Sequence, residues 1–523
     1  DMSLLTSEVV AAKAEAPEHC HLVARFGERA GANGQTYATR MRLRLPADAS
    51  WNGRFYFEGG GGTDGNLGAA TGATMAGERS ALARGFAVVS TDAGHDNAVN
   101  NDPDRGGSAT FGLDPQARLD YGYNALDAVT RQAKGLLETF YDRPPEYSYF
   151  VGCSNGGRQA MMASQRFPEH FDGIVAGNPG FNLPRAGIAE AWDSQQFASA
   201  ARAIDASQVD PQGHPLIRFG FSPSDLQLVA DDILAVCDKL DGVEDGIVGD
   251  FAPCNYDPAV RLPALQCLIT KQPGCLAVSQ VQALQRVMAG PRNSANEPLY
   301  SDWPWDPGIA AGGWRAWKLE TAPNAPVNNA INLTLGAAAL PYVFTTPPTI
   351  TTDLVGYMLN FDMDNDAPKI EATSGEFSTP AMQFMAANST DLSAFRARGA
   401  KMIVYHGLAD PVFSFNDTRN WYGGVVAASG GSNAGLANAR SFVRLFPVPG
   451  MNHCSGGPAT DRFDALTAVV DWVEQGVAPD SILASANPAS GFAGRTRPLC
   501  PYPQVARYDG SSDIEQAASF VCR

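Results

Sequence analysis

The residues 147–164 constrain the fold of this 523-residue chain more than any other stretch. Residues 147–151 are mostly aromatic or apolar, which is typical of a buried strand. The tight turn Gly152-Cys153-Ser154-Asn155-Gly156 follows, and the residues after it favour a helix. The flanking glycines let Ser154 stand free at the carboxyl end of the strand, where helix N–H groups favour negative charge. The pattern predicts a nucleophile elbow. The alternative is a turn of small residues without chemistry.

The segments around this turn alternate between strand and helix patterns. We predict strands at 38–46, 55–58, 85–92, 400–407 and 443–448, and helices at 119–141 and 462–476. Because strands that alternate with helices form parallel sheets, we expect an α/β fold with a mostly parallel sheet. Residues 181–390 are rich in Pro, Asn, Ala and Gly. We interpret them as an inserted domain between the core parts 1–180 and 391–523.

The later strands end in the residues that a nucleophilic serine needs. A histidine takes the proton of the serine, and an aspartate fixes the tautomer and charge of that histidine. Ser154, Asp410 and His453 occur in the chain order of an α/β-hydrolase triad. Taken singly, an Asp after a strand is commonly a turn former, and a lone His is usually a surface residue. His95 precedes the elbow and His406 lies within a strand, so both fit the role less well.

A glycine-rich loop, Gly59-Gly60-Gly61-Gly62-Thr63-Asp64-Gly65, follows the predicted strand 55–58. It lacks the Lys-Ser/Thr pair of a phosphate-binding loop. After an early strand of a serine hydrolase, such a loop supplies one oxyanion-hole N–H, and the residue after the nucleophile supplies another. We therefore predict that the N–H groups of Gly62 and Asn155 form the oxyanion hole. A flexible turn is the alternative.

The net charge limits the classes of partner, and the cysteine content indicates the cellular compartment. The net charge of −17 argues against nucleic acid and anionic membrane surfaces as partners. No apolar run approaches the ~20 residues of a membrane span. The nine cysteines indicate disulfides and therefore an oxidising compartment. We expect a secreted or periplasmic monomer, and we take the sequence as a mature form without its signal peptide.

Cysteines flank two residues of the predicted triad, as Cys153-Ser154 and His453-Cys454. If the triad forms, Cys153 and Cys454 lie close enough for a disulfide; otherwise they are two separate buried thiols. With Asp410, this arrangement resembles the tannase and feruloyl esterase family, and the resemblance spans nearly the whole chain. It implies an α/β-hydrolase core with a large lid and a serine carboxylesterase acting on small esters of aromatic acids.

Local spacing and the expected contact within the triad predict the cysteine pairing. The predicted disulfides are Cys153–Cys454, Cys237–Cys254, Cys267–Cys275 and Cys500–Cys522, with Cys20 unpaired.

An acidic loop, residues 238–247, carries a candidate metal site. Taken alone, a loop of Asp and Gly is more often solvated, and its spacing is not that of an EF-hand. The family resemblance implies a structural calcium site instead. The side chains of Asp238, Asp241 and Asp245 and the main-chain carbonyls of Val243 and Ile247 would be its ligands. We expect no organic cofactor.

The resemblance also implies a substrate pocket, with Trp317 as an aromatic wall and Leu183 and Phe413 as apolar lining. The segments 94–100, 111–118 and 450–457 are most similar to family members that hydrolyse mono(2-hydroxyethyl) terephthalate (MHET). Such members grip the substrate carboxylate with a lid arginine. Ungapped counting places Ile331 at that position and Leu335 at a neighbouring aromatic position. Since neither Ile331 nor the adjacent Asn332 can form a bidentate ion pair with a carboxylate, we expect neutral aromatic esters to be preferred over MHET.

The predicted substrates are hydroxycinnamate, gallate or MHET esters. Two other functions stay open from the sequence. One is a non-catalytic ligand-binding protein on a hydrolase scaffold, which the intact triad disfavours. The other is a serine peptidase, which a covering lid disfavours.

Overall fold

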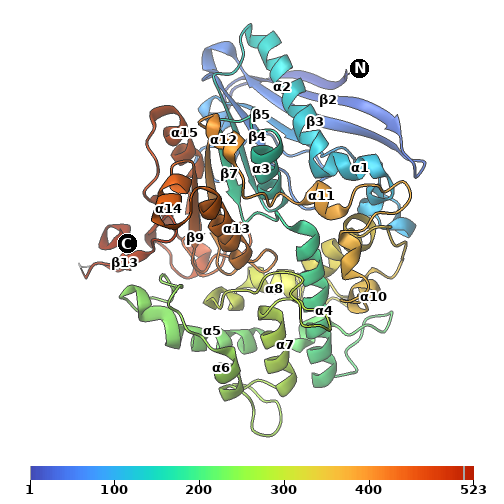
Figure 1. The fold of residues 1–523 in the computed structure, drawn as a ribbon, viewed down its shortest axis with the longest axis vertical. Coiled ribbons are helices and arrows are strands. Elements are labelled where there is room, and N and C mark those ends of the chain that lie inside the picture. Colours follow the sequence, from blue (N-terminus) through green and yellow to red (C-terminus); the bar gives the residue numbers. More distant parts are fainter. Residues whose placement is uncertain (1, 511–512) are drawn as a thin grey trace.

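The computed structural model describes residues 2–510 and 513–523 and contains a nine-stranded mixed sheet (Figure 1). Across the sheet the strands run in the order β1-β2-β3-β5-β4-β6-β7-β8-β9. Their bounds are β1 Met2–Val10, β2 His19–Ala30, β3 Thr36–Pro46, β4 Arg54–Glu58, β5 Ala87–Thr91, β6 Tyr147–Cys153, β7 Gly173–Gly177, β8 Lys401–Gly407 and β9 Val443–Val448.

The six strands β5, β4, β6, β7, β8 and β9, which are neighbours in this order, are parallel. Strands β1, β2 and β3 add an antiparallel edge. The predicted parallel sheet is therefore confirmed for its centre. The central strands are buried on both faces, since helices cover each side. Successive residues enter opposite cores: Phe55 and Phe57 pack on one face and Tyr56 on the other.

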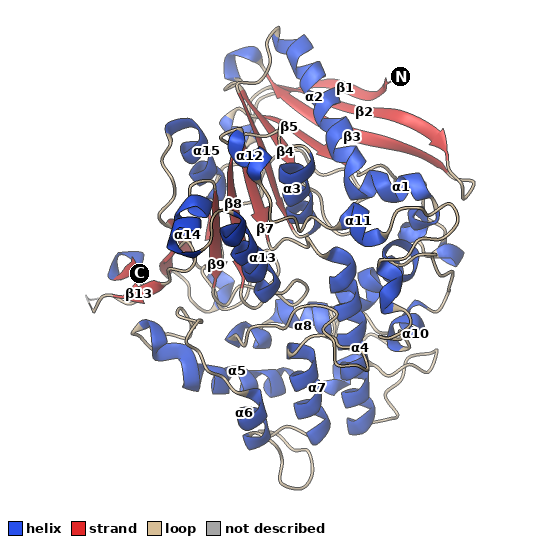
Figure 2. Cartoon of the chain, in the orientation of Figure 1, coloured by secondary structure: helices blue, strands red, loops and turns tan. Residues whose placement is uncertain are grey.

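Two sets of helices cover this sheet (Figure 2). Helices α2 (Ala125–Tyr141), α3 (Asn155–Arg166) and α13 (Phe415–Ala428) contribute to the core on one face. Helix α15 (Ala465–Gln475) packs against the opposite face through Leu466, Val469 and Trp472. Helix α14 (Ser432–Arg440) lies beside α13.

The chain between β7 and β8 contributes no strand to the nine-stranded sheet. The helices of this segment are α4 Leu183–Ile204, α5 Pro223–Cys237, α6 Pro258–Ala264, α7 Val278–Met288, α8 Gly312–Lys318, α9 Ala337–Ala339, α10 Leu354–Leu359, α11 Ala381–Met385 and α12 Ser393–Ala397. Below the sheet in Figure 1, helices α5, α6, α7, α8 and α10 of this segment lie around the long helix α4, whereas α11 and α12 lie beside the sheet. We call residues 178–400 the helical segment.

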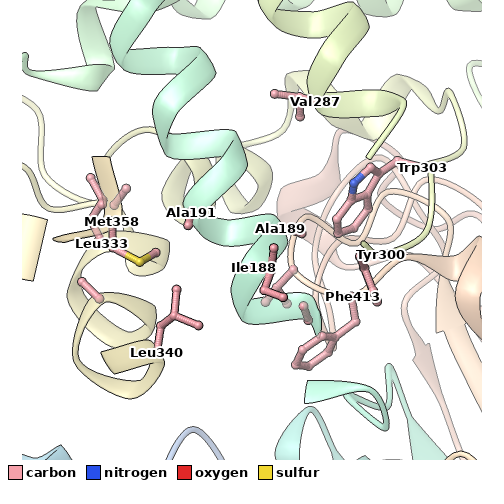
Figure 3. Packing of buried hydrophobic residues seen from close by; sticks show 14 of the residues in the cluster. Ile188, Ala189, Ala191, Val287, Tyr300, Trp303, Leu333, Leu340, Met358 and Phe413 are labelled. Atoms are coloured by element: carbon pink, nitrogen blue, oxygen red, sulfur yellow. The ribbon is translucent and has the colours of Figure 1, made fainter. Parts of the chain in front are cut away.

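The helical segment has a hydrophobic core of its own, centred on α4. Figure 3 shows Leu333, Leu340 and Met358 on one side of α4 and Tyr300 and Trp303 on another. The same cluster includes buried side chains outside the segment, among them Phe111, Tyr121 and Phe413. The segment is therefore joined to the sheet part by a continuous apolar interface, which includes the residues around the predicted active site.

Two predicted elements differ from the observed ones. The helix at 462–476 begins at Ala465, because the Asp464 side chain caps it and Arg462–Phe463 forms strand β10. The helix at 119–141 begins earlier, with α1 (Pro115–Leu119), a π-helical turn η5 (Asp120–Asn124) and then α2.

Strands β1, β2 and β7, and the tail strands β11 (Ile482–Ser485), β12 (Thr496–Leu499), β13 (Ala506–Tyr508) and β14 (Phe520–Cys522), were not predicted from the sequence. Strand β7 is only Gly-Ile-Val-Ala-Gly, too short to carry a periodic signal.

The cysteine pairing agrees with the prediction. The structure contains the disulfides Cys153–Cys454, Cys237–Cys254, Cys267–Cys275 and Cys500–Cys522, and Cys20 is free. Within residues 2–510 and 513–523, no helix combines the length and apolar character needed to cross a bilayer.

Candidate active site

The predicted catalytic residues lie at the carboxyl ends of neighbouring parallel strands. Ser154 follows β6, Asp410 follows β8, and His453 follows β9. Parallel strands bring their carboxyl ends to one edge of the sheet, so residues far apart in sequence meet there. The disulfide between Cys153 and Cys454 joins the turn of the serine to the loop of the histidine, with Cα atoms 6.0 Å apart.

Ser154 occupies a strained backbone conformation between β6 and α3. Its φ of 66° and ψ of −127° lie where non-glycine residues are rare. The turn has no room for side chains: a Cβ on Gly152 would lie 2.5 Å from the backbone of Gly156, and one on Gly156 would lie 2.6 Å from the Gly60 carbonyl oxygen. The glycines thus let the elbow and the glycine-rich loop approach backbone to backbone.

Asp410 orients His453. The Nδ1 atom of His453 lies 2.9 Å from Oδ2 of Asp410, at hydrogen-bond distance. The Asp410 carboxylate also accepts hydrogen bonds from the side chain of Asn178 at 2.6 Å and from the backbone N–H groups of Val412 and Phe413. This shell fixes the position of the carboxylate, which is fully buried.

Burial raises the pKa of Asp410, but the charges and hydrogen bonds of His453 and His406 outweigh it and hold that pKa far below its ordinary value. His406 Nε2 lies 3.3 Å from the same carboxylate. Its ring nitrogens also contact the hydroxyl of Thr418 and the carbonyl oxygen of Phe413. His406 is therefore part of the support of Asp410, and Asp410 is ionised whenever the protein is folded near neutral pH.

The other nitrogen of His453 is free. Its Nε2 is buried and has no hydrogen-bond partner within the described part of the chain. The ring packs edge to face on Trp317 and Phe413, with centroids 5.0 and 5.4 Å away. The imidazole is therefore held from three sides, with its Nε2 available to a proton donor.

The two predicted oxyanion residues, Gly62 and Asn155, are linked through Tyr121. The Tyr121 hydroxyl lies 3.2 Å from the Gly62 carbonyl oxygen and 3.4 Å from Oδ1 of Asn155. Arg158, which is fully buried, donates from Nε to the same Asn155 oxygen at 2.7 Å. The side chain of Asn155 is thus turned away into a network, and only its backbone N–H is left to act at the elbow.

Asp64 supports the same loop from behind. It accepts hydrogen bonds from the side chains of Asn155 and Gln159, and Gln159 in turn accepts one from the Gly60 N–H at 2.9 Å. Burial raises the pKa of Asp64 to about 7. The glycine-rich loop is therefore pinned to helix α3, which carries the residues after the nucleophile.

A cavity with about 370 Å³ of empty space, its open part included, begins at Ser154. Four predicted pocket residues line it: Leu183, Trp317, Leu335 and Phe413. The other lining residues are Gly62, Thr63, Tyr121, Asn155, Glu190, Gly336, Ala339, Phe344 and Val412.

Ile331 does not line this cavity, so its predicted place in the pocket is corrected. It precedes the π-helical turn η9 (Asn332–Gly336), about one turn before Leu335, and the side chain that reaches the cavity is that of Leu335. Residues one helical turn apart share a face but are displaced along the helix axis, so Leu335 reaches the cavity and Ile331 does not.

Several site residues were not predicted from the sequence. Asn178 follows the unpredicted strand β7, and Tyr121 lies inside a helical run, so neither has a local signature. Glu190 had a usable signal, because it is the one acid in the apolar run 186–192 of α4. An acid in such a run is either paired or placed for a ligand.

The predicted calcium loop offers only oxygen donors. Asp238 accepts hydrogen bonds from the Asp245 and Gly246 N–H groups, and Asp245 pairs with Arg497. Asp241 is buried, and burial, with repulsion from Asp245 and Asp238, raises its pKa to about 7.

Within residues 2–510 and 513–523, no three His, Cys, Asp or Glu side chains converge in metal-binding geometry. The hard-oxygen donor set and the mutual repulsion of the carboxylates nevertheless fit a Ca²⁺ ion, with Arg497 competing for Asp245.

Comparison with known proteins places this geometry among esterases. Residues 26–523 match the family model described as tannase and feruloyl esterase. A mono(2-hydroxyethyl) terephthalate hydrolase from Piscinibacter sakaiensis is 50% identical over 533 residues, covering 98% of this chain and 86% of that protein. A probable feruloyl esterase from Arthroderma benhamiae is 29% identical, covering 91% of this chain and 81% of that protein.

The fold agrees as well. The crystal structure of feruloyl esterase B from Aspergillus oryzae has a TM-score of 0.75 at 24% identity, covering 100% of this chain and 97% of that chain.

Proposed function

Since the chain belongs to the tannase and feruloyl esterase family and is a carboxylic ester hydrolase, we propose that Ser154, Asp410 and His453 hydrolyse small esters of aromatic acids. The observation that carries the proposal is the 2.9 Å contact from His453 to the buried Asp410, beside a serine on a strained elbow. A histidine oriented in this way is a general base for the serine hydroxyl.

In the proposed mechanism, His453 Nε2 removes the proton of Ser154 while Oγ attacks the ester carbonyl carbon. Asp410 stabilises the imidazolium that forms. The N–H groups of Gly62 and Asn155 receive the oxyanion, a contribution of about 3 kcal/mol for one such donor in other hydrolases. The imidazolium then protonates the leaving alcohol, and an acyl-enzyme remains. Water, deprotonated by His453, releases the acid by the reverse sequence.

We further propose that the helical segment acts as a lid over Ser154. Residues of the segment, among them Trp317, Leu335 and Phe344, line the cavity together with Tyr121 of the sheet part. A ring of apolar side chains around the serine suits an aromatic group. The relative that is 50% identical is named for hydrolysis of MHET. Neutral aromatic esters stay our preferred substrates here, because no cation lines the described cavity.

Calcium and location are secondary proposals. Asp238, Asp241 and Asp245, with the carbonyls of Val243 and Ile247, would hold a structural Ca²⁺ that takes no part in the chemistry. Four disulfides support a secreted or periplasmic enzyme. We propose that it works as a monomer.

Turnover of p-nitrophenyl acetate tests the catalytic assignment. Ser154→Ala is expected to abolish turnover, because the acyl-enzyme cannot form, while its melting temperature stays close to wild type. The matched control is Ser164→Ala on helix α3, which follows Ser154; the Ser164 hydroxyl donates to the Met161 carbonyl and takes no part in the mechanism. Full activity of Ser154→Ala would refute the assignment, and no turnover by wild type would favour a binding protein.

A further inference from the structure

One buried carboxyl contacts both segments that carry the predicted oxyanion donors. Asp64 ends the tight turn of the glycine-rich loop, where its N–H donates to the Gly61 carbonyl oxygen at 2.9 Å. Its side chain folds back over Gly60, since a Cβ on Gly60 would lie 2.5 Å from Oδ2 of Asp64. The carboxyl also reaches helix α3, and the residue is 6% exposed. Asp64 therefore lies between the loop of Gly62 and the helix of Asn155.

The two amides that face Asp64 can be oriented in only one way. An arginine side chain and a backbone N–H can donate hydrogen bonds but cannot accept them. Arg158 Nε lies 2.7 Å from Oδ1 of Asn155, so the NH2 group of Asn155 points to Asp64. The Gly60 N–H lies 2.9 Å from Oε1 of Gln159, so the NH2 group of Gln159 also points to Asp64, with Nε2 2.7 Å from Oδ2. Each oxygen of Asp64 thus receives an N–H donor.

Two donors that face one carboxyl require it to be ionised. A proton on either oxygen would point at an N–H group and would remove one of the two hydrogen bonds. Burial raises the pKa of Asp64 to about 7, with a further rise from Asp92. Arg158 and the two amides act against this rise. Above that pKa, the carboxylate holds both amides, and through Gln159 it holds the Gly60 N–H.

These contacts set the separation of the two oxyanion donors. Gly62 lies between Gly60 and Asp64, which are both tied to α3, and Asn155 is the first residue of that helix. A donor contributes only where it meets the developing oxyanion at about 3 Å. A misplacement of about 1 Å can slow catalysis by ~10²-fold. Asp64 itself does not line the cavity, so any effect on the reaction passes through the groups that it holds.

We propose that Asp64 is a positioning residue, whose carboxylate holds the N–H groups of Gly62 and Asn155 at the separation that the oxyanion needs. The inference rests on the proposed function, because it takes these two groups as the oxyanion donors. Loss of the carboxylate should therefore slow the chemical step and leave substrate binding in the ground state largely unchanged.

The test replaces Asp64 with Asn, which tolerates the same left-handed backbone (φ 50°) but cannot accept from two N–H groups through separate oxygens. At pH 8.5 we expect kcat for p-nitrophenyl acetate to fall about tenfold or more, with KM within about threefold of wild type. An aryl trifluoromethyl ketone forms an oxyanion adduct with a nucleophilic serine, and its inhibition constant should rise as kcat/KM falls. Asp142→Asn, an exposed change at φ 55°, should keep wild-type kinetics.

A double variant moves the charge instead of removing it. In Asp64→Asn/Gln159→Glu, the carboxylate at position 159 can accept from the Gly60 N–H and from the amide at position 64, whose oxygen can accept from Asn155. All the hydrogen bonds are restored, so kcat should return to within about threefold of wild type. Gln159→Glu alone places two carboxyls face to face and should be slow. Lower stability alone would reduce the melting temperature without changing kcat of the folded protein.

The outcomes separate the two levels of the proposal. No turnover by wild type, or wild-type turnover by Ser154→Ala, refutes the proposed function itself. Where wild type is active, an unchanged kcat in Asp64→Asn, or a double variant no faster than Asp64→Asn, refutes only the role of Asp64. If circular dichroism shows that Asp64→Asn is unfolded, Gln159→Met takes its place. It keeps the carboxylate but cuts its link to Gly60, and a wild-type kcat in this variant would overturn the proposal.

Discussion

At the scale of single residues, the site is defined by what surrounds each catalytic group. Asp410 is surrounded by donors from Asn178, Val412 and Phe413 and by two histidines, which keep it ionised. Its carboxylate can therefore serve His453 as a fixed negative charge. Asp64 and Glu190 are buried with weaker compensation, and their pKa values are raised. Carboxyl groups of one site thus have pKa values shifted in opposite directions, because their surroundings differ.

Replacing Asp410 with Asn tests its role. The amide keeps the shape but cannot stabilise the imidazolium, and it favours the wrong tautomer of His453. We expect kcat to fall by about 10⁴-fold, as for the corresponding change in a serine protease. Stopped-flow or steady-state kinetics on p-nitrophenyl acetate measure the loss.

His406→Gln is the comparison for Asp410→Asn, because His406 contacts the same carboxylate from the other side. It should reduce activity much less than His453→Gln. Equal losses in the two histidine variants would contradict the assignment of His453 as the base.

At the scale of elements, one covalent link and one hydrogen-bonded link hold loops at the carboxyl edge of the sheet. The disulfide between Cys153 and Cys454 connects the elbow of β6 to the loop after β9, across 301 residues of sequence. The Gln159 side chain connects α3 to the glycine-rich loop after β4. The positions of the nucleophile, the base and the oxyanion donors are therefore coupled between elements.

The double variant Cys153→Ser/Cys454→Ser should lose activity even where it is folded. Without the link, the loops of Ser154 and His453 can separate, and a small misplacement greatly slows catalysis. We expect roughly a tenfold or greater loss of kcat/KM in a cold assay, together with lower stability from the freed loop. Circular dichroism would confirm folding before each assay.

The matched control is Cys267→Ser/Cys275→Ser. It removes a disulfide that closes only a short loop of the helical segment. That variant should keep its activity. Full activity in the folded Cys153→Ser/Cys454→Ser variant would show that the sheet alone holds the two catalytic loops in register.

Calcium binding to the loop 238–247 is the second element-scale prediction. Calcium that binds only the native state should raise the melting temperature, and EGTA should lower it. Asp241→Ala should remove this response, while activity in a cold assay is largely kept because no step uses the ion. Differential scanning fluorimetry and elemental analysis provide the two measurements.

Glu244→Ala is the control within the same loop, because Glu244 is exposed and is no proposed ligand. It should keep the calcium response. If wild type neither binds calcium nor responds to it, the ion pair of Asp245 with Arg497 is sufficient to neutralise the loop.

At the scale of the whole molecule, distant parts of the chain are joined by buried polar contacts. The C-terminal residues Arg495 and Arg497 contact Asp245, and Arg507 contacts Asp250, so the tail is fastened to the helical segment. The helical segment shares its apolar core with residues of the sheet part such as Phe111. We therefore expect the two parts to unfold together.

The pH dependence of stability follows from several buried carboxyls. Burial raises the pKa of Asp92, Asp306 and Asp417 to about 6, of Asp64 to about 7 and of Glu190 to about 8. In the unfolded chain such groups ionise near pH ~4. Between about pH 4 and these raised values, the native state holds protons that the unfolded chain has lost, so the free energy of unfolding rises as pH falls.

We therefore expect the melting temperature, measured in EGTA, to increase from about pH 8 to about pH 5. Each group that is protonated only in the native state contributes about 1.4 kcal/mol per pH unit. Asp306→Asn removes one of these groups and should flatten the dependence. A melting temperature that instead falls as the solution is acidified over this range would show that these carboxyls are ionised in the native state.

What the sequence by itself determined is local or periodic. The glycine spacing around Ser154 specifies a tight turn, and the apolar runs before Asp410 and His453 specify strands. In a parallel sheet, strand ends converge on one edge, so the meeting of Ser154, Asp410 and His453 could be predicted without coordinates. The cysteine pairing followed from the same convergence and from short spacings.

Only the tertiary structure decided which side chains surround these groups. Asn178 reaches Asp410 across 232 residues, and Tyr121 joins Gly62 to Asn155 from a helix. The same holds for the cavity, which is lined by the predicted Leu335 but not by the predicted Ile331, and where Glu190 faces Gly336. Such contacts depend on how helices rotate and pack against one another. That packing is set by the summed burial of many side chains, and no short stretch of sequence records it.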